Sequence, residues 1–275
     1  MNKTKIDWCD MTWNPVTGCL HGCKYCYARR IAERFKGGGY GKEMGMFISK
    51  YKDDAFQPPY ELAESQLAET KGGWYREAPY PYGFAPTFHQ YRLHEPANMK
   101  KPQNIFVCSM ADLFGDWVPD EWINMVFNAC RDAPQHTYMF LTKNPKRYSD
   151  LFASGNLPED FWYGYTATKT KDLWKFHHEN DCPCAHLFVS IEPILEPIPP
   201  MFHSHIPADW VIIGAETGRR FGKVVPKREW IEKIVNYCTA NQIPVFMKSS
   251  LAEIWEEPLI QQWPEGLKLK GDVKA

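Results

Sequence analysis

Long apolar runs are missing from this sequence of 275 residues. No stretch of eighteen consecutive apolar residues occurs, so we expect no transmembrane helix and no membrane partner. The segment Met1–Trp8 has no apolar signal-peptide core either. We therefore expect a cytoplasmic protein, whose nine cysteines serve as free thiols or metal ligands rather than as disulfides.

An excess of charge of either sign is also missing. The 32 Lys and Arg residues and 33 Asp and Glu residues leave a formal net charge of −1, so no global positive field attracts nucleic acid. Binding to DNA or RNA would need a local patch. Basic residues lie among aromatic residues, as in sites that grip phosphates and stack bases, at Arg29, Arg30, Arg76, His89, Arg92, His94, Lys100 and Lys101. An ordinary solvated surface explains the same residues equally well.

A second C-x2-C pair is missing as well, and this matters for the most distinctive segment of the chain. Cys19, Cys23 and Cys26 follow a C-x3-C-x2-C spacing, and thiolates suit iron–sulfur clusters or zinc. Structural zinc commonly uses two C-x2-C arms. One alternative is therefore zinc with Cys9 or His21 as a fourth ligand. The other is a four-iron cluster with three protein thiolates and one open iron.

Regular alternation of strands and helices begins at residue 104, which indicates a parallel sheet covered by helices. The predicted strands are 104–109, 137–142, 161–166, 187–191, 210–214 and 244–247, and the predicted helices are 120–131, 145–153, 171–178 and 228–240. Upstream we expect a strand over 12–17 and a helix over 27–35 with Ala28, Ile31, Ala32 and Phe35 on one side. Residues 37–100 form an irregular insertion, with one short helix over 60–70, that could cover a site as a lid. Residues 249–275 are a C-terminal segment of the same single domain, 1–275.

Polar residues directly follow the predicted apolar strands. Functional residues of parallel α/β folds lie at the carboxyl ends of strands, and these ends carry Asp112, Thr142, Lys143, Thr166, Thr168, Ser190, Glu192, Glu216 and Lys248. Each residue alone is compatible with a loop or a helix cap. Their recurrence at one topological position predicts a polar mouth that faces the cysteines.

The cysteine spacing, with Tyr25 directly before Cys26, resembles the signature loop of the radical S-adenosylmethionine (SAM) superfamily. The alternation from residue 104 is similar to the partial (β/α)6 TIM-like barrel of that superfamily. The segments Trp13–Cys19, Ser109–Phe114, Leu141–Pro145, Ser190–Pro193 and Val211–Glu216 resemble a phage-associated family of such proteins, largely of unassigned function.

This resemblance implies that Cys19, Cys23 and Cys26 bind three irons of a [4Fe–4S] cluster and that SAM chelates the fourth. One electron then splits SAM into methionine and a 5′-deoxyadenosyl radical, which abstracts hydrogen from a substrate. The implied contacts are Tyr25 with the adenine, Asp112 with the methionine amino group, Lys143 with its carboxylate and Glu192 with the ribose. Ser190, beside Glu192, and Glu216, at the adenine-side strand, complete the predicted cofactor-binding set. At Asp112 the usual Gly-Gly-Glu of the superfamily is replaced by Met-Ala-Asp.

A second group of potential ligands lies at His177, His178, Cys182, Cys184 and His186. It could hold zinc or an auxiliary cluster, and a solvated loop is the alternative. Cys108, Cys130 and Cys238 stand in apolar patterns and are predicted to be buried.

The phage resemblance favours modification or repair of nucleic acid or nucleotide as the reaction. We expect an external electron donor, flavodoxin or ferredoxin, because the chain has no further redox domain. Radical modification of a peptide or small metabolite is one alternative. A zinc- or cluster-stabilised nucleic-acid-binding protein without catalysis is the other.

Overall fold

The structure, a computed structural model, describes residues 1–36, 59–70, 72–173, 175, 186–199, 208–217 and 224–267. These residues pack as two compact units. The first unit holds Met1 and the described parts of Trp13–Lys100 and Val107–Pro134, and the second holds the remaining described residues. The single domain stays a prediction.

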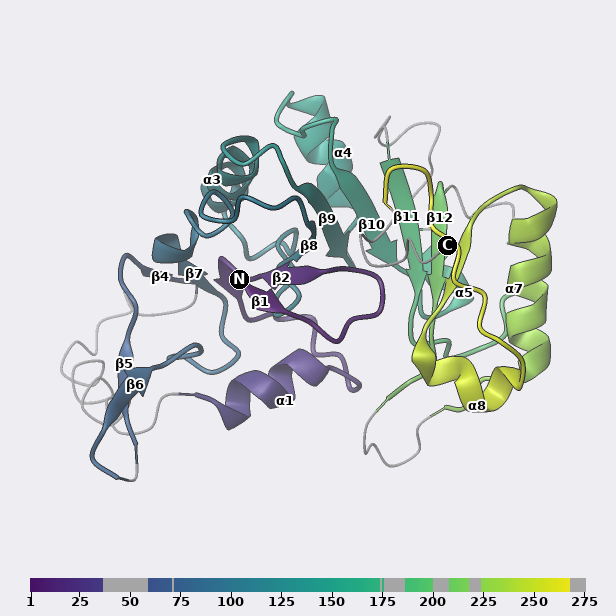
Figure 1. Cartoon of the computed structure of the whole chain (residues 1–275), viewed down its shortest axis with the longest axis horizontal. Helices are drawn as coiled ribbons and strands as arrows, with labels where there is room; N and C mark the ends of the chain where they lie inside the picture. The colour runs from purple at the N-terminus through teal and green to yellow at the C-terminus, as the bar shows by residue number, and fades with distance from the viewer. Residues whose placement is uncertain are drawn as a thin grey trace. The chain divides into compact units, whose positions relative to one another are not determined.

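The second unit is built on an eight-stranded sheet with the strand order β1-β2-β8-β9-β10-β11-β12-β13 (Figure 1). The strands are β1 (Asn2–Lys3), β2 (Met11–Trp13), β8 (Asn104–Val107), β9 (Thr137–Thr142), β10 (Trp162–Thr166), β11 (His186–Ile191), β12 (Trp210–Ile213) and β13 (Val245–Met247). All neighbours from β8 to β13 are parallel, whereas β1 and β2 are antiparallel. The predicted mixed α/β class with a large parallel sheet is therefore confirmed. In the part of the chain that the structure describes the sheet is open, with β1 and β13 at its edges, and a barrel is not shown.

Helices connect the parallel strands, as the alternation predicted. They are α4 (Lys146–Ala153), α5 (Thr170–Leu173) and α7 (Arg228–Ala240), and η3 (Ser249–Leu251) and α8 (Ala252–Trp255) follow β13. The buried side chains of α7 are Ile231, Ile234, Val235 and Cys238, which is the apolar side expected from its 3.6-residue period. No helix among the described residues has the length and apolar character needed to cross a lipid bilayer.

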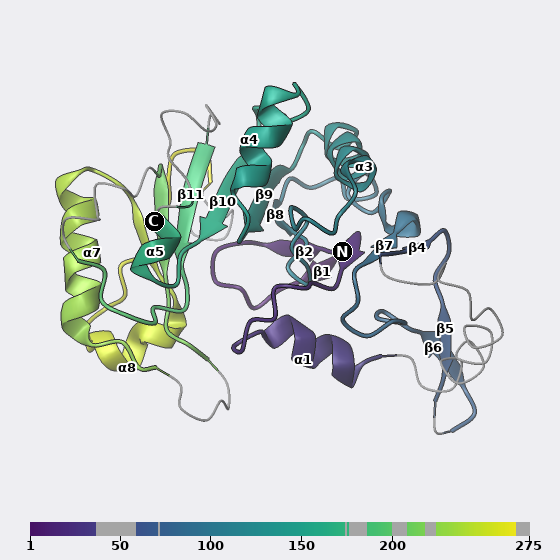
Figure 2. The same ribbon diagram turned by 180° about the vertical axis from the view of Figure 1, so that it is seen from behind.

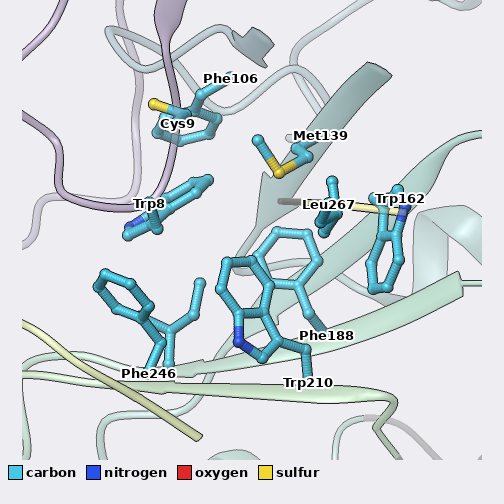
Figure 3. Close-up of a cluster of buried hydrophobic side chains, with 10 residues drawn as sticks. Trp8, Cys9, Phe106, Met139, Trp162, Phe188, Trp210, Phe246 and Leu267 are labelled. Atoms are coloured by element: carbon cyan, nitrogen blue, oxygen red, sulfur yellow. The ribbon is translucent and has the colours of Figure 1, made fainter. Parts of the chain in front are cut away.

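One face of the sheet carries an aromatic core (Figure 3). The ring of Trp8 lies 4.7 Å from that of Phe106 and 5.9 Å from that of Phe188, measured between centroids. Gly164 in β10 makes room for Phe188, because a Cβ at Gly164 would lie 2.3 Å from the Phe188 ring. Leu267 closes this core from the C-terminal segment, and its carbonyl accepts a hydrogen bond from Asn104 Nδ2 at 3.0 Å. Short strands that are far apart in the sequence thus share one hydrophobic core.

Among its described residues, the first unit contains two smaller sheets, two α-helices and one 3-10 helix. The sheets are β3-β7-β4 and the pair β5-β6. The elements are β3 (Val16–Thr17), α1 (Tyr27–Arg34), β4 (Tyr60–Leu62), β5 (Leu67–Glu69), β6 (Tyr75–Glu77), β7 (Thr87–His89), η1 (Gln90–Arg92) and α3 (Asp120–Arg131). Every residue of β7 is buried. Figure 2 shows α1 and β5-β6 from the opposite side.

Several element predictions need correction. The helix over 60–70 is wrong: Tyr60–Leu62 pairs with β7 and Leu67–Glu69 pairs with β6. Its Glu, Leu, Ala and Gln residues favour a helix by propensity, but strand pairing outweighs that weak preference. Residues 59–70 and 72–100 are thus less irregular than predicted. The strand over 12–17 is two strands separated by Asn14 and Pro15, and α4 begins at Lys146 after Pro145. Of the helix over 171–178, the described part ends at Leu173.

Candidate metal centre

The segment 18–26, here called the cysteine loop, is fixed at its start by backbone pairing within the first unit. Gly18 forms a parallel bridge with Ala111, and its N–H donates to the Met110 carbonyl at 2.9 Å. Gly18 has φ +86°, and a Cβ there would lie 2.2 Å from the Ala85 carbonyl oxygen. Only glycine fits this close approach. The Cys19 N–H then donates to the Phe84 carbonyl at 3.2 Å.

The end of the cysteine loop is fixed by helix α1. Cys26 is the N-cap residue, and its Sγ accepts a hydrogen bond from the Arg29 N–H at 3.3 Å. The Cys26 N–H donates to the Cys23 carbonyl at 3.2 Å, so these two cysteines belong to one turn. The Arg29 guanidinium donates back to the Cys19 carbonyl at 3.4 Å. Arg29 in the first turn of α1 therefore contacts both Cys26 and Cys19, near the two ends of the loop.

All three loop cysteines are free thiols of intermediate exposure. Cys19 and Cys26 pack against a small apolar cluster that includes Ala28, Phe84 and Met110. Burial raises the pKa of the Cys19 thiol to about 12, with smaller contributions from the nearby Asp112, Cys23 and Cys26. A bound metal would be needed to hold such a thiol as thiolate.

The two kinds of metal centre require different spacings between the thiols. A mononuclear zinc places every sulfur about 2.3 Å from one point. Within the described ranges, no three His, Cys, Asp or Glu side chains are grouped so that they could hold a metal ion. In a cluster each thiolate binds a different iron, so the sulfurs lie further apart. Three half-buried thiols from one short loop fit a cluster by donor type.

A histidine–aspartate pair lies next to the thiols. His21 Nε2 donates to Asp112 Oδ2 at 2.7 Å, and Asp112 Oδ1 accepts from the Phe114 N–H at 3.1 Å. The His21 ring packs edge-on against Trp117, with centroids 4.8 Å apart. Asp112 is only 5% exposed. The sequence identified both residues but did not predict their hydrogen bond, because they are 91 positions apart in the chain.

Tyr25 and Tyr27 flank Cys26. Tyr25 has intermediate exposure, and its predicted contact with an adenine stays a prediction. Tyr27 Oη donates to the Ser109 carbonyl at 2.8 Å. Asn14 Oδ1 accepts from the Met110 N–H at 2.9 Å and from Ser109 Oγ at 3.2 Å. The Trp13–Cys19 and Ser109–Phe114 segments are thus held together.

The other predicted cofactor residues lie in the second unit, at the carboxyl ends of its parallel strands. Glu192 follows β11 and Lys248 follows β13, and their carboxylate and ammonium groups form an ion pair. They meet over Gly214, which follows β12: a Cβ there would lie 3.2 Å from side-chain carbons of both residues. Lys248 was noted at a strand end but missed as a partner of Glu192. The absence of a side chain at position 214 is the signal that could have indicated this contact.

Lys143, Ser190 and Glu216 belong to the same unit as Glu192 and Lys248. Lys143 follows β9 and is half-buried, while Ser190 in β11 and Glu216 after β12 are buried. Tyr25 and Asp112, by contrast, belong to the first unit. The structure therefore brings together Glu192 with Lys248, and Asp112 with the cysteine loop. A mouth that joins the two sets stays a prediction.

Two of the basic residues proposed to grip phosphate serve the fold instead. His89 is fully buried, and its Nε2 lies 2.9 Å from Thr17 Oγ1. Burial, with a contribution from Arg92, lowers the pKa of His89 from 6.5 to about 2, so its ring is neutral. The Arg92 guanidinium donates to the carbonyls of Asn14 and Pro79. Neither side chain is a free cation for a phosphate.

The other cysteines, and the histidines of the second predicted ligand group, fall into three sets. Cys9, Cys108, Cys130 and Cys238 are buried, which confirms the prediction for the last three. His177, His178, Cys182 and Cys184 lie outside the described residues. His186, the first residue of β11, stacks on Trp162 with ring centroids 4.6 Å apart.

Several solved structures of spore photoproduct lyase are similar to this chain. A cysteine-to-serine variant of spore photoproduct lyase aligns with 90% of this chain and 78% of its own at 9% identity, with a TM-score of 0.49. A variant with bound AdoMet and dinucleoside spore photoproduct covers the same shares at 9% identity and a TM-score of 0.48. The enzyme complexed with dinucleoside spore photoproduct covers 84% of this chain and 74% of its own, at 9% identity and a TM-score of 0.43.

The other two comparisons concern sequence. Comparison with curated proteins found no match. The model of one protein family matches residues 3–261, which is nearly the whole chain. The chain therefore belongs to the family described as "Protein of unknown function (DUF5131)".

Proposed function

We propose that this chain is a radical SAM enzyme with a partial TIM-like barrel, and that its substrate is a nucleic acid or nucleotide. The observation that carries the proposal is the cysteine loop, in which three half-buried thiols lie between the Gly18 bridge and the Cys26 cap of α1. Fixed loop ends keep the thiols in place before any metal binds, which lowers the ordering cost of binding.

Cys19, Cys23 and Cys26 hold a [4Fe–4S] cluster in this proposal. When bound, the cluster and SAM together supply one-electron cleavage of SAM and a radical that takes hydrogen from the substrate. The protein binds, orients and excludes water. His21 and Asp112 hold the loop, and Phe84 and Met110 shield Cys19 and Cys26 from solvent on one side.

The SAM-binding roles remain those implied by the superfamily pattern. Tyr25 contacts the adenine, Asp112 the amino group and Lys143 the carboxylate. Glu192 contacts the ribose, with Ser190 and Glu216 beside it. Lys248 already neutralises Glu192, so a ribose hydroxyl would share that carboxylate with an ammonium group. Asp112 accepts hydrogen bonds from His21 and from the Phe114 N–H, so the methionine amino group would share this carboxylate with them.

Anaerobic reconstitution with iron and sulfide tests the proposal. We expect about four irons per chain, a broad absorption near ~400 nm and release of 5′-deoxyadenosine from SAM on chemical reduction. Cys23→Ala should lose both the absorption and the cleavage. The matched control is Cys238→Ala, which changes a buried cysteine of α7 and should keep both. Stoichiometric zinc without cleavage, or full cleavage in Cys23→Ala, would refute the assignment.

A transfer experiment tests the substrate class. Reconstituted enzyme is incubated with deuterated DNA, RNA or peptide pools, and deuterium in the released 5′-deoxyadenosine is measured. Enrichment from a nucleic-acid pool supports the proposal. Enrichment from the peptide pool alone would replace nucleic acid by peptide as the substrate.

A further inference from the structure

Helix α1 presents large apolar side chains to solvent. Tyr27, Ile31 and Phe35 are spaced by four residues and are 43%, 38% and 38% exposed, and Leu20 in the cysteine loop is 54% exposed. The predicted apolar side of this helix is split, because only Ala28 and Ala32 are buried. The exposed set Leu20, Tyr27, Ile31 and Phe35 is here called the α1 face; Figure 1 shows the helix that carries most of it. Because residues four positions apart are neighbours on a helix surface, Tyr27, Ile31 and Phe35 form one exposed apolar stripe, and such patches mark interaction sites.

Basic side chains are frequent in the segment that carries the α1 face. Residues 20–36 contain five exposed cations and one exposed acid, so their net charge is 5 − 1 = +4, whereas the whole chain has −1. The cations are Lys24, Arg29, Arg30, Arg34 and Lys36, and the acid is Glu33. Glu33 is already paired with Lys36. An apolar centre with an arginine-rich rim is the usual composition of a protein–protein interface.

The α1 face begins beside the thiols. Tyr27 directly follows Cys26, and Leu20 directly follows Cys19. The helix rises 1.5 Å per residue, so the apolar stripe from Tyr27 to Phe35 spans about 12 Å. A partner seated on this face would therefore lie next to the candidate metal centre.

We propose that the α1 face docks an acidic one-electron carrier protein of the flavodoxin or ferredoxin class, an inference that rests on the function proposed above. The positive rim selects a negative partner and raises its association rate. One electron passes from the reduced carrier, which is oxidised by one electron, to the centre held by Cys19, Cys23 and Cys26, and no atom is transferred. Single-stranded nucleic acid is the competing occupant, because Tyr27 and Phe35 offer rings on which bases stack whereas Leu20 and Ile31 do not.

Binding of a purified flavodoxin to the reconstituted protein, measured by calorimetry, tests the docking site directly. Arg30→Glu/Arg34→Glu reverses two rim charges but spares Arg29, which contacts the cysteine loop. We expect Kd to rise at least about tenfold and its salt dependence to flatten. The matched control is Lys227→Glu/Lys233→Glu, which makes the same charge change at exposed positions of the α7 region and should alter Kd less than about twofold.

A second pair of variants tests the apolar centre. Ile31→Ser should weaken flavodoxin binding several-fold, whereas Met125→Ser on α3, a residue of the same 38% exposure, should not. Equal binding by wild type and both α1 variants would overturn the proposal. So would loss of single-stranded DNA binding, rather than flavodoxin binding, in Arg30→Glu/Arg34→Glu.

Cleavage of SAM with two reductants separates this inference from the function on which it rests. Dithionite needs no docking site, so Arg30→Glu/Arg34→Glu should cleave SAM at the wild-type rate with dithionite and more slowly with reduced flavodoxin. No cleavage by the wild type with either reductant would sink the proposed function, while the binding assay would still decide the docking site. Equal rates in wild type and variant with flavodoxin would sink the docking site alone.

Discussion

At the residue scale, the cysteine loop depends on contacts that its cysteines do not make themselves. Gly18 permits a close backbone approach, and His21 reaches a buried carboxylate on another segment. The spacing of the cysteines can be read from the sequence, whereas the contacts that anchor the loop cannot be predicted from it. Because a hydrogen bond to a buried charged group contributes about 1.5–3 kcal/mol, the His21–Asp112 pair is large enough to decide the loop conformation.

Replacing His21 should loosen the loop before any metal is bound. His21→Phe keeps a ring against Trp117 but cannot donate to Asp112. We expect a thiol reagent to modify Cys19 and Cys23 of the metal-free protein up to about tenfold faster, as read by peptide mass spectrometry. Asp112→Ala should act through the same bond, so the double variant should be no faster than the faster single one.

Asp116→Ala provides the comparison, because it removes an exposed carboxylate of the same segment. Unchanged labelling in that variant and in His21→Phe would show that the pair does not hold the loop.

Buried His89 should make the first unit sensitive to acid. The pKa of His89 is about 2 in the folded state and 6.5 in the unfolded state. Protonation of this histidine at low pH therefore favours the unfolded state. The contribution of neutral His89 to the free energy of unfolding is fully present above pH 6.5. It falls as the pH drops through that value, since only the unfolded chain takes up the proton. The slope is about 1.4 kcal/mol per pH unit, or roughly 2 kcal/mol between pH 6.5 and 5.

Denaturant titrations at pH 7 and pH 5 measure this effect. His89→Gln should be less stable than wild type at pH 7, because it disturbs the contacts to Thr17 and Tyr91, but it should lose less stability on acidification. An equal loss in both proteins would contradict the assignment to His89.

At the element scale, propensity and tertiary pairing disagree in the first unit and agree in the second. Residues 60–70 have helical composition but supply two strands, because β7 and β6 offer pairing partners. In the second unit, continuous apolar runs became parallel strands as predicted, since each is buried on both faces. Gly164 in β10 leaves space in this sheet for the Phe188 ring.

Gly164→Ala should destabilise the second unit. A methyl group at this position would collide with the Phe188 ring, whose position is set by the aromatic core (Figure 3). Overpacking of this kind costs about 1–3 kcal/mol of unfolding free energy, measurable by urea titration. Phe188→Leu removes the colliding ring edge, so Gly164→Ala should cost much less in that background. Additive losses would rule out the collision as the cause.

At the scale of the whole molecule, the predicted site residues fall into two compact units. Cys19, Cys23, Cys26, Tyr25 and Asp112 belong to the first, and Lys143, Ser190, Glu192 and Glu216 belong to the second. The chain passes between the units where β2 and β8 end, so strands of the large sheet lead directly into the segments that carry the cysteines and Asp112. This connection explains why reading strand ends from the sequence selected residues of both units.

The sequence by itself determined the donor set and the α/β class, because both depend on local patterns: cysteine spacing for the first, apolar runs and helical periods for the second. Tertiary structure alone decided that Asp112 pairs with His21, that Glu192 pairs with Lys248, that His89 is neutral and that Ile31 and Phe35 face solvent. The physical reason is the same in each case. A partner far away in sequence, or its absence, sets the burial and charge of a side chain, and no local pattern records that partner.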